Sequence, residues 1–236
     1  MIEIRKSDER GIAEHGWLSS RHSFSFAQYY DPRHMGFGPL RVINEDRVHP
    51  GHGFGTHGHQ NMEIISYVLS GALEHKDSMG SGSVLRYGQV QRMSAGRGVM
   101  HSEFNPSASE PVHFLQIWIT PDTQNTAPDY DEAFFDTSDK KGQWRLIVSP
   151  DGRDGSLRIR QDAWLYASIL DTGDALSYTL APGRCGYLHV ARGAVTANDV
   201  RLGAGDALQF VNEPRISLVC PANAEILLFD LPATAD

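Results

Sequence analysis

The sequence predicts an all-β protein composed of two antiparallel β-barrel domains of the jelly-roll type. Three observations support this class. Short apolar segments of strand length alternate with turns along the 236 residues, and 23 Gly and 12 Pro provide the turns. No long amphipathic helix interrupts the pattern. Two pairs of similar segments recur about 120 residues apart, which indicates a duplicated unit.

Five segments have the length and the β-branched or aromatic composition of strands. In chain order they are Ile64–Gly71, Val112–Thr120, Trp144–Pro150, Ala163–Leu170 and Ala224–Leu231. The segment Pro121–Gln143 is polar and acidic, and we expect it to connect the two β units. This places an N-terminal domain at residues 1–132 and a C-terminal domain at residues 133–236.

The recurring segments define the duplication. VLSGAL (Val68–Leu73) returns as VARGAV (Val190–Val195), and YGQVQRM (Tyr87–Met93) returns as AGDALQF (Ala204–Phe210). Two copies of one barrel are the simplest explanation of this spacing.

Composition and charge exclude several classes of function. The formal charge of -8, the pI of about 5.7 and the lack of a basic run argue against direct binding to nucleic acid. The N-terminus lacks the apolar core of a signal peptide, and no stretch reaches the roughly 18 apolar residues of a membrane span. We therefore expect a cytoplasmic protein that acts as a monomer. Cys185 and Cys220 have no CxxC spacing and are expected to be plain buried thiols.

Two short motifs indicate a metal site. His57 and His59 are two residues apart, and His101 and Glu103 repeat this spacing. On a strand, such pairs share one face about 6.6 Å apart, so two strands facing the same interior bring three imidazoles and a carboxylate together. These donors suit Fe(II), Ni, Cu, Mn, Co or Zn, and the lack of thiolates favours a redox or Lewis-acid ion over structural zinc.

Two residues, Glu63 and Glu103, could provide the acidic ligand. Glu63 lies four residues beyond His59, about 13 Å away on a straight strand, and only a turn at Gln60 and Asn61 brings it near. Glu103 needs no such bend, and we favour it.

The second domain is expected to lack metal ligands. Ten of the eleven histidines lie at or before His113. When the repeat offset is applied to the two motifs, it reaches the neighbourhood of Thr179, Ala181, Leu218 and Cys220, none of which is a histidine or a carboxylate.

Three other features carry less weight. GFGTHG (Gly53–Gly58) matches GxGxxG but leads into a histidine strand instead of a helix, so it provides no pyrophosphate site. Ser102 faces away from His101 on a strand, which removes it as a nucleophile. An aromatic cluster is expected to belong to the core, with a pocket for a flat ligand as the alternative; its members are Phe24, Phe26, Tyr29, Tyr30 and Phe37.

Three long stretches, Arg21–Val48, Gly53–Gly80 and Val90–Asn105, closely resemble the pirin family of the cupin superfamily. The second half, from QDAWLYASIL (Gln161–Leu170) to GAGDALQF (Gly203–Phe210), resembles the bacterial pirin-like subgroup that includes quercetin 2,3-dioxygenases. The resemblance implies a bicupin.

The resemblance also implies one divalent metal ion, usually iron, bound in the N-terminal domain by His57, His59, His101 and Glu103. The general cupin pattern would favour Glu63 instead. The implied activity is opening of the central ring of a flavonol such as quercetin by molecular oxygen, with Glu103 also acting as the base. The alternative is a metal-bound regulatory module that acts through a protein partner.

Overall fold

The computed structural model describes residues 1–233, which form two compact units. The first unit comprises Gly11–Phe134 and Leu157–Gln161. The second unit comprises Met1–Arg10, Phe135–Ser156 and the chain from Asp162 onward. Both consist of antiparallel strands, which confirms the predicted all-β class. Residues 1–233 contain no helix with the length and hydropathy of a membrane span.

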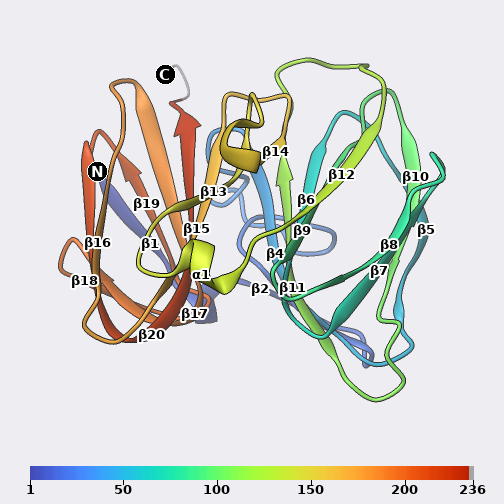
Figure 1. Cartoon of the computed structure of the whole chain (residues 1–236), viewed down its shortest axis with the longest axis horizontal. Helices are drawn as coiled ribbons and strands as arrows, with labels where there is room; N and C mark the ends of the chain where they lie inside the picture. Colours follow the sequence, from blue (N-terminus) through green and yellow to red (C-terminus); the bar gives the residue numbers. More distant parts are fainter. Residues whose placement is uncertain (234–236) are drawn as a thin grey trace. The chain divides into compact units, whose positions relative to one another are not determined.

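The first unit contains two separate sheets (Figure 1). The seven-stranded sheet has the order β12-β9-β6-β11-β4-β3-β2, and the four-stranded sheet has the order β5-β10-β7-β8. The strands of the larger sheet are β2 (Gly11–Glu14), β3 (Leu18–His22), β4 (Leu40–Val48), β6 (Glu63–Ser70), β9 (Gln89–Ser94), β11 (Val112–Ile119) and β12 (Asp129–Phe134). Those of the smaller sheet are β5 (Gly53–His59), β7 (Ala72–Asp77), β8 (Gly82–Arg86) and β10 (Val99–Phe104). The unit is therefore a jelly-roll sandwich and not a closed barrel.

Apolar and polar side chains divide the space between these sheets. One apolar cluster contains Leu18, Val48, Val68, Leu73, Leu85, Val112 and Phe114, and all of these are buried. Burial of each large apolar side chain stabilises the fold by about 1.5–3 kcal/mol. Buried polar side chains occupy a neighbouring region of the same interior, and the candidate site lies there.

The second unit contains the remaining long strands. Its main path is β1-β19-β17-β20-β15-β13, with β16 on β20 and β18 on β17. The bounds are β1 (Ile2–Arg5), β13 (Arg145–Ser149), β15 (Trp164–Leu170), β16 (Ala175–Thr179), β17 (Arg184–Ala197), β18 (Val200–Gly203), β19 (Ala207–Val211) and β20 (Arg215–Pro232). Short elements are the 3-10 turns η1 (Ser7–Glu9) and η2 (Arg153–Gly155), the helix α1 (Thr137–Lys140) and, in the first unit, β14 (Leu157–Arg158).

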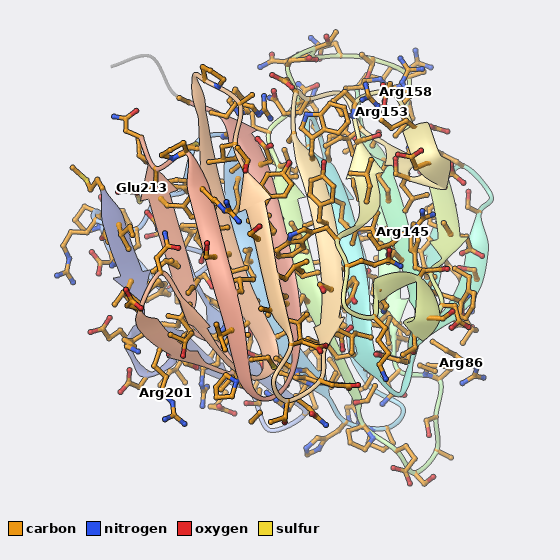
Figure 2. All side chains as sticks on the ribbon, turned by 60° about the vertical axis from the view of Figure 1, so that its left-hand side comes forward. Arg86, Arg145, Arg153, Arg158, Arg201 and Glu213 are labelled. Atoms are coloured by element: carbon orange, nitrogen blue, oxygen red, sulfur yellow. The ribbon has the colours of Figure 1, made fainter. Side chains whose placement is uncertain are left out.

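Two stretches, residues 1–10 and Leu157–Gln161, lie in the other unit from the one predicted, and the main boundary falls after Phe134 instead of after residue 132. β1 pairs with β19, about 200 residues away, so the first ten residues lie in the second unit. Figure 2 shows Glu213 beside this strand. Its carboxylate lies 3.6 Å from the amino group of Met1. The segment Pro121–Gln143 is not only a connection, because β12 within it pairs with β9. Neither pairing is visible in local sequence because both partners are distant.

Two glycines from the recurring segments occupy comparable positions. Gly71 has a φ of +77° and Gly193 a φ of +72°, both in the left-handed region that favours glycine. A Cβ atom would lie 2.5 Å from the Pro111 carbonyl oxygen at Gly71 and 1.8 Å from that of Asn223 at Gly193. The repeated glycine is therefore required by backbone geometry in both units.

The two cysteines are free and buried, as predicted. Burial raises the pKa of the Cys185 thiol to about 11. Cys220 packs with Leu218 in the apolar core of the second unit. Both positions reached by the repeat offset from His101 and Glu103 are thus core positions in the second unit.

Candidate metal centre

Strand pairing brings the three predicted histidines together. β5 and β10 lie side by side and run antiparallel (Figure 1). In this pairing His101 lies directly opposite His57. His59 follows on the same face of β5. The Nε2 atom of His101 is 2.9 Å from Nε2 of His59 and 3.1 Å from Nε2 of His57. Three ring nitrogens therefore converge on one point inside the sandwich.

These imidazoles have lone pairs available for a cation. Burial lowers the pKa of His59 to about 4 and that of His101 to about 2, and neighbouring imidazoles add to both effects. Both rings are therefore neutral at pH 7. The Nδ1 atom of His57 lies 2.8 Å from the carbonyl oxygen of Gly55, so this nitrogen donates, and in the neutral tautomer Nε2 keeps its lone pair. The short contacts between Nε2 atoms can be ring N–H···N hydrogen bonds, and a cation can replace the shared protons when all three Nε2 atoms present lone pairs.

Ring nitrogens of His57, His59 and His101 all lie within 4.8 Å of one another, close enough to bind one ion together. Because no thiolate is among them, these three residues would suit a catalytic divalent ion better than a closed structural zinc.

Glu103 borders this cluster. It is 2 % exposed, and the pairing of β10 with β5 shifts register between His101 and Glu103. One of its carboxylate oxygens and one ring nitrogen each from His75 and His101 lie within 4.8 Å of one another. The structure thus brings His57, His59 and His101 into one cluster, and places Glu103 in an adjoining cluster that shares His101.

Three donors hold the Glu103 carboxylate. Ser66 and Gln91 each donate to its Oε1 at 2.9 Å, and the Gln116 amide donates to Oε2 at 2.5 Å. A carboxylate accepts about four hydrogen bonds, so one lone-pair direction remains for a metal ion or a proton. Burial raises the pKa of Glu103 to about 7, with the hydrogen bond from Ser66 opposing and the Asp46 carboxyl adding to the rise. Such a group can accept and release a proton near neutral pH.

The donors to Glu103 belong to a buried polar row across the larger sheet. Cross-strand pairs connect β3, β4, β11, β6 and β9 in this order. The row consists of His22, Asn44, Gln116, Ser66 and Gln91, all less than 9 % exposed. Because paired residues point to the same face of a sheet, these side chains all face the smaller sheet and its histidines.

Glu63, the competing acid, lies elsewhere. It begins β6 opposite Ser94 on β9, and the Ser94 hydroxyl donates to its carboxylate at 2.6 Å. Burial raises its pKa, which this hydrogen bond and the charge of Arg92 oppose. Among residues 1–233, Glu63 belongs to neither of the two clusters with metal-ligand geometry.

A cavity of about 80 Å³ opens beside the histidines. Its walls combine aromatic rings with the polar row, and include Phe26, Phe54, Trp118, Asn44, Asp46, His57, His59 and Glu103. Burial raises the pKa of Asp46 to about 7, and the Ser20 hydroxyl donates to this carboxyl. The cavity therefore places two proton-accepting carboxyls beside the histidine cluster.

The aromatic cluster of the sequence divides between core and cavity. Phe24 is 1 % exposed and belongs to the core, whereas Tyr30 is 72 % exposed. Phe26 contacts Trp118 edge to face, with 5.3 Å between ring centroids, and both rings line the cavity. The core assignment is therefore right for Phe24 and wrong for Phe26, which lines the cavity, and for Tyr30, which is exposed.

Several site residues escape prediction from sequence. His75 and Asp77 have the same two-residue spacing as the histidine motifs, which is a signal that could have identified them. Asn44, Ser66, Gln91 and Gln116 carry no such signal, because only strand register brings them together.

Comparison with known proteins agrees with this architecture. Residues 4–119 match the Pirin family model, and residues 146–231 match the model described as the quercetinase C-terminal cupin domain. The chain is 47% identical over 232 residues to a protein of Escherichia coli strain K12 named quercetin 2,3-dioxygenase, covering 98% of this chain and 99% of that protein. It is 40% identical over 231 residues to a pirin-like protein of Caulobacter vibrioides, with 98% and 99% of the two chains covered.

A solved structure extends the likeness to the fold. The crystal structure of bacterial pirin YhhW in complex with nickel(II), from Escherichia coli, superposes with a TM-score of 0.95 at 46% identity, covering 99% of this chain and 100% of that one. The two jelly-roll units and this similarity over nearly the full length establish that the chain belongs to the pirin family of bicupins.

Proposed function

We propose that this protein is a metal-dependent dioxygenase that opens the central ring of a flavonol such as quercetin with molecular oxygen. The observation that carries the proposal is the convergence of three imidazoles beside a buried carboxyl of raised pKa, at the wall of a cavity. The relatives named quercetin 2,3-dioxygenase support the choice of reaction.

His57, His59, His101 and Glu103 would hold one divalent ion, with Glu103 binding through one oxygen. Fe(II) is our preferred ion, because the pirin resemblance implies it and the nitrogen donors suit it. The nickel(II) complex of YhhW supports nickel as the alternative. A bound divalent ion supplies Lewis acidity, which lowers the pKa of a coordinating hydroxyl group.

The side chains then perform three tasks. Glu103 would accept the proton of the flavonol 3-hydroxyl on its one free lone pair, in exchange for its contact with the ion, while Ser66, Gln91 and Gln116 hold its carboxyl in position. Phe26 and Trp118 offer aromatic surface to flat rings. The overall reaction adds O₂ to the flavonol, opens the central ring and releases one carbon monoxide, so that the ring-opened ester retains the other carbons.

The polar wall suits a substrate with hydrogen-bonding groups. Asn44 is 3 % exposed, and neither its Oδ1 atom nor the Nε1 atom of Trp118 has a hydrogen-bond partner within the described chain. Both residues line the cavity. An acceptor and a donor left unpaired in a cavity wall favour a ligand that supplies a hydroxyl and a carbonyl.

The cavity is smaller than a flavonol requires. Sites for drug-sized ligands span about 300–1,000 Å³, compared with about 80 Å³ here. A flavonol would therefore bind with part of its ring system outside the cavity, or with the aromatic lining displaced. A smaller enolic substrate would need neither change.

Oxygen uptake in the presence of quercetin, before and after chelation, tests the proposal. A dioxygenase consumes oxygen only while the metal is bound. The alternative, a regulatory module acting through a protein partner, would bind the metal and show no turnover. A structural metal would change the thermal stability alone.

A further inference from the structure

The metal-site histidines differ in what holds their second ring nitrogen. Nδ1 of His57 donates to the Gly55 carbonyl, which fixes the ring. Nδ1 of His101 is buried and has no hydrogen-bond partner within residues 1–233. If Nε2 of His101 binds a metal ion, its Nδ1 carries the proton and becomes a buried donor that needs an acceptor.

His75 on β7 has a buried ring nitrogen that lacks a hydrogen-bond donor. The side chains of His75 and Asp77 are fully buried, and Nε2 of His75 lies 3.0 Å from the Asp77 carboxylate. The same carboxylate accepts backbone hydrogen bonds from Met79 and Ser81 at 2.8 and 3.0 Å, which fix its position. Nε2 of His75 is therefore the donor in the neutral ring. Its Nδ1 is a buried acceptor without a partner within the described residues.

Packing and register bring these two rings together. β7 pairs with β10 so that His75 lies opposite Glu103, and Asp77 lies opposite His101. The ring centroids of His75 and His101 are 5.4 Å apart. Tyr130 stacks on the His75 ring with 4.7 Å between centroids and an interplanar angle of 20°, which restrains the orientation of His75.

We propose that His75 and Asp77 are positioning residues for the metal ligand His101. The two Nδ1 atoms are not hydrogen-bonded to each other in the metal-free structure. With Nε2 of His101 on the metal, a small adjustment of the rings lets its Nδ1–H group donate to Nδ1 of His75, whose Nε2–H group donates to Asp77. This chain satisfies the unpaired donor and the unpaired acceptor together, and it fixes the tautomer that leaves Nε2 of His101 free for the ion. This inference depends on the metal site of the proposed function but not on the flavonol substrate.

Asp77→Asn tests the chain with little change of shape. The Asn carbonyl can still accept from Met79 and Ser81, but its amide donates to His75 and forces the proton onto His75 Nδ1. The Nδ1–H group of His75 then faces the Nδ1–H group of His101, and neither finds an acceptor. We expect affinity for Ni(II), measured without substrate by competition with a chelator, to fall about 10–100-fold. Glu45→Gln is the matched control, because Glu45 forms a similar pair with His113 at 2.9 Å outside the metal cluster.

A second substitution and a spectroscopic signature separate positioning from mere packing. His75→Gln retains an acceptor and should bind Ni(II) more tightly than His75→Leu does. In the Co(II)-loaded protein, the shifted exchangeable ¹H NMR signal of the His101 ring N–H should move in Asp77→Asn, while that of His57 stays.

Unchanged Ni(II) affinity and an unmoved His101 signal in Asp77→Asn would overturn the inference. Two ions per chain in the wild type would also overturn it, since His75 would then be a ligand itself. Failure of the wild type to bind any ion would refute the metal site of the proposed function, which distinguishes the two failures.

Discussion

Glu103 on β10 accepts a hydrogen bond from Gln116 on β11 at 2.5 Å, which joins the two sheets of the first unit at the candidate metal centre. The Ser66 hydroxyl lies 2.9 Å from Glu103 and 3.1 Å from the amide oxygen of Gln116, and its single proton can go to either. The carboxylate therefore occupies a preformed position before any ion or substrate binds. This preorganisation limits Glu103 to one further interaction at a time.

Replacement of Glu103 by Gln should separate metal binding from catalysis. The amide oxygen can still bind the ion weakly, but it cannot accept the substrate proton. We expect part of the metal to remain while kcat for quercetin falls about 10²-fold or more. Metal analysis and steady-state kinetics measure both effects. Glu63→Gln is the control and should be much milder; if it empties the site while Glu103→Gln does not, the acidic ligand is Glu63.

Proton release on metal binding tests whether Glu103 is a ligand. A carboxyl with a pKa of about 7 holds about 0.9 proton at pH 6 and must lose it to bind a cation. Below pH 7, metal affinity should therefore rise with pH. Calorimetry in buffers of different ionisation enthalpy should show about one proton fewer released per ion in Glu103→Gln than in the wild type. Equal release in both proteins would remove Glu103 from the ligand set, and Glu63→Gln should behave as the wild type.

The unpaired carbonyl of Asn44 predicts a role in substrate binding. Asn44→Leu removes the acceptor and leaves the histidines intact, so the metal content should not change. Loss of one hydrogen bond corresponds to a rise in KM for quercetin of about 3–10-fold. Kinetics of the metal-loaded variant measure this rise. A normal KM would mean that the substrate does not reach this wall of the cavity.

The cysteines should have no part in the metal chemistry. Cys185→Ser and Cys220→Ser bury a hydroxyl beside the backbone carbonyl oxygens that the thiols now contact. They should reduce the free energy of unfolding by about 1 kcal/mol, because the smaller oxygen loses packing while it keeps an acceptor. Metal content and activity per folded molecule should stay at wild-type values. Thermal denaturation and metal analysis check both statements, and metal loss in either variant would reveal a site in the second unit.

The spacing of residues within single strands was enough to predict the histidines of the candidate site. His57, His59 and His101 could be identified because two residues at i and i+2 share a strand face whatever the rest of the fold. The fold class followed from strand-length apolar segments. The pairing of β1 with β19 and the row from His22 to Gln91 could not be predicted, since each depends on register between strands far apart in sequence.

Turnover of quercetin by the metal-loaded protein tests the central proposal most directly. Oxygen consumption and carbon monoxide release should be measured with quercetin and with its 3-deoxy analogue, in the wild type and in a variant with His57 and His59 both replaced by Ala. A flavonol dioxygenase with this site consumes one O₂ and releases one CO per quercetin, rejects the analogue that has no hydroxyl to coordinate, and loses both metal and activity in the double variant. Similar rates with both compounds, or no turnover with any reconstituted divalent metal, would contradict the proposal.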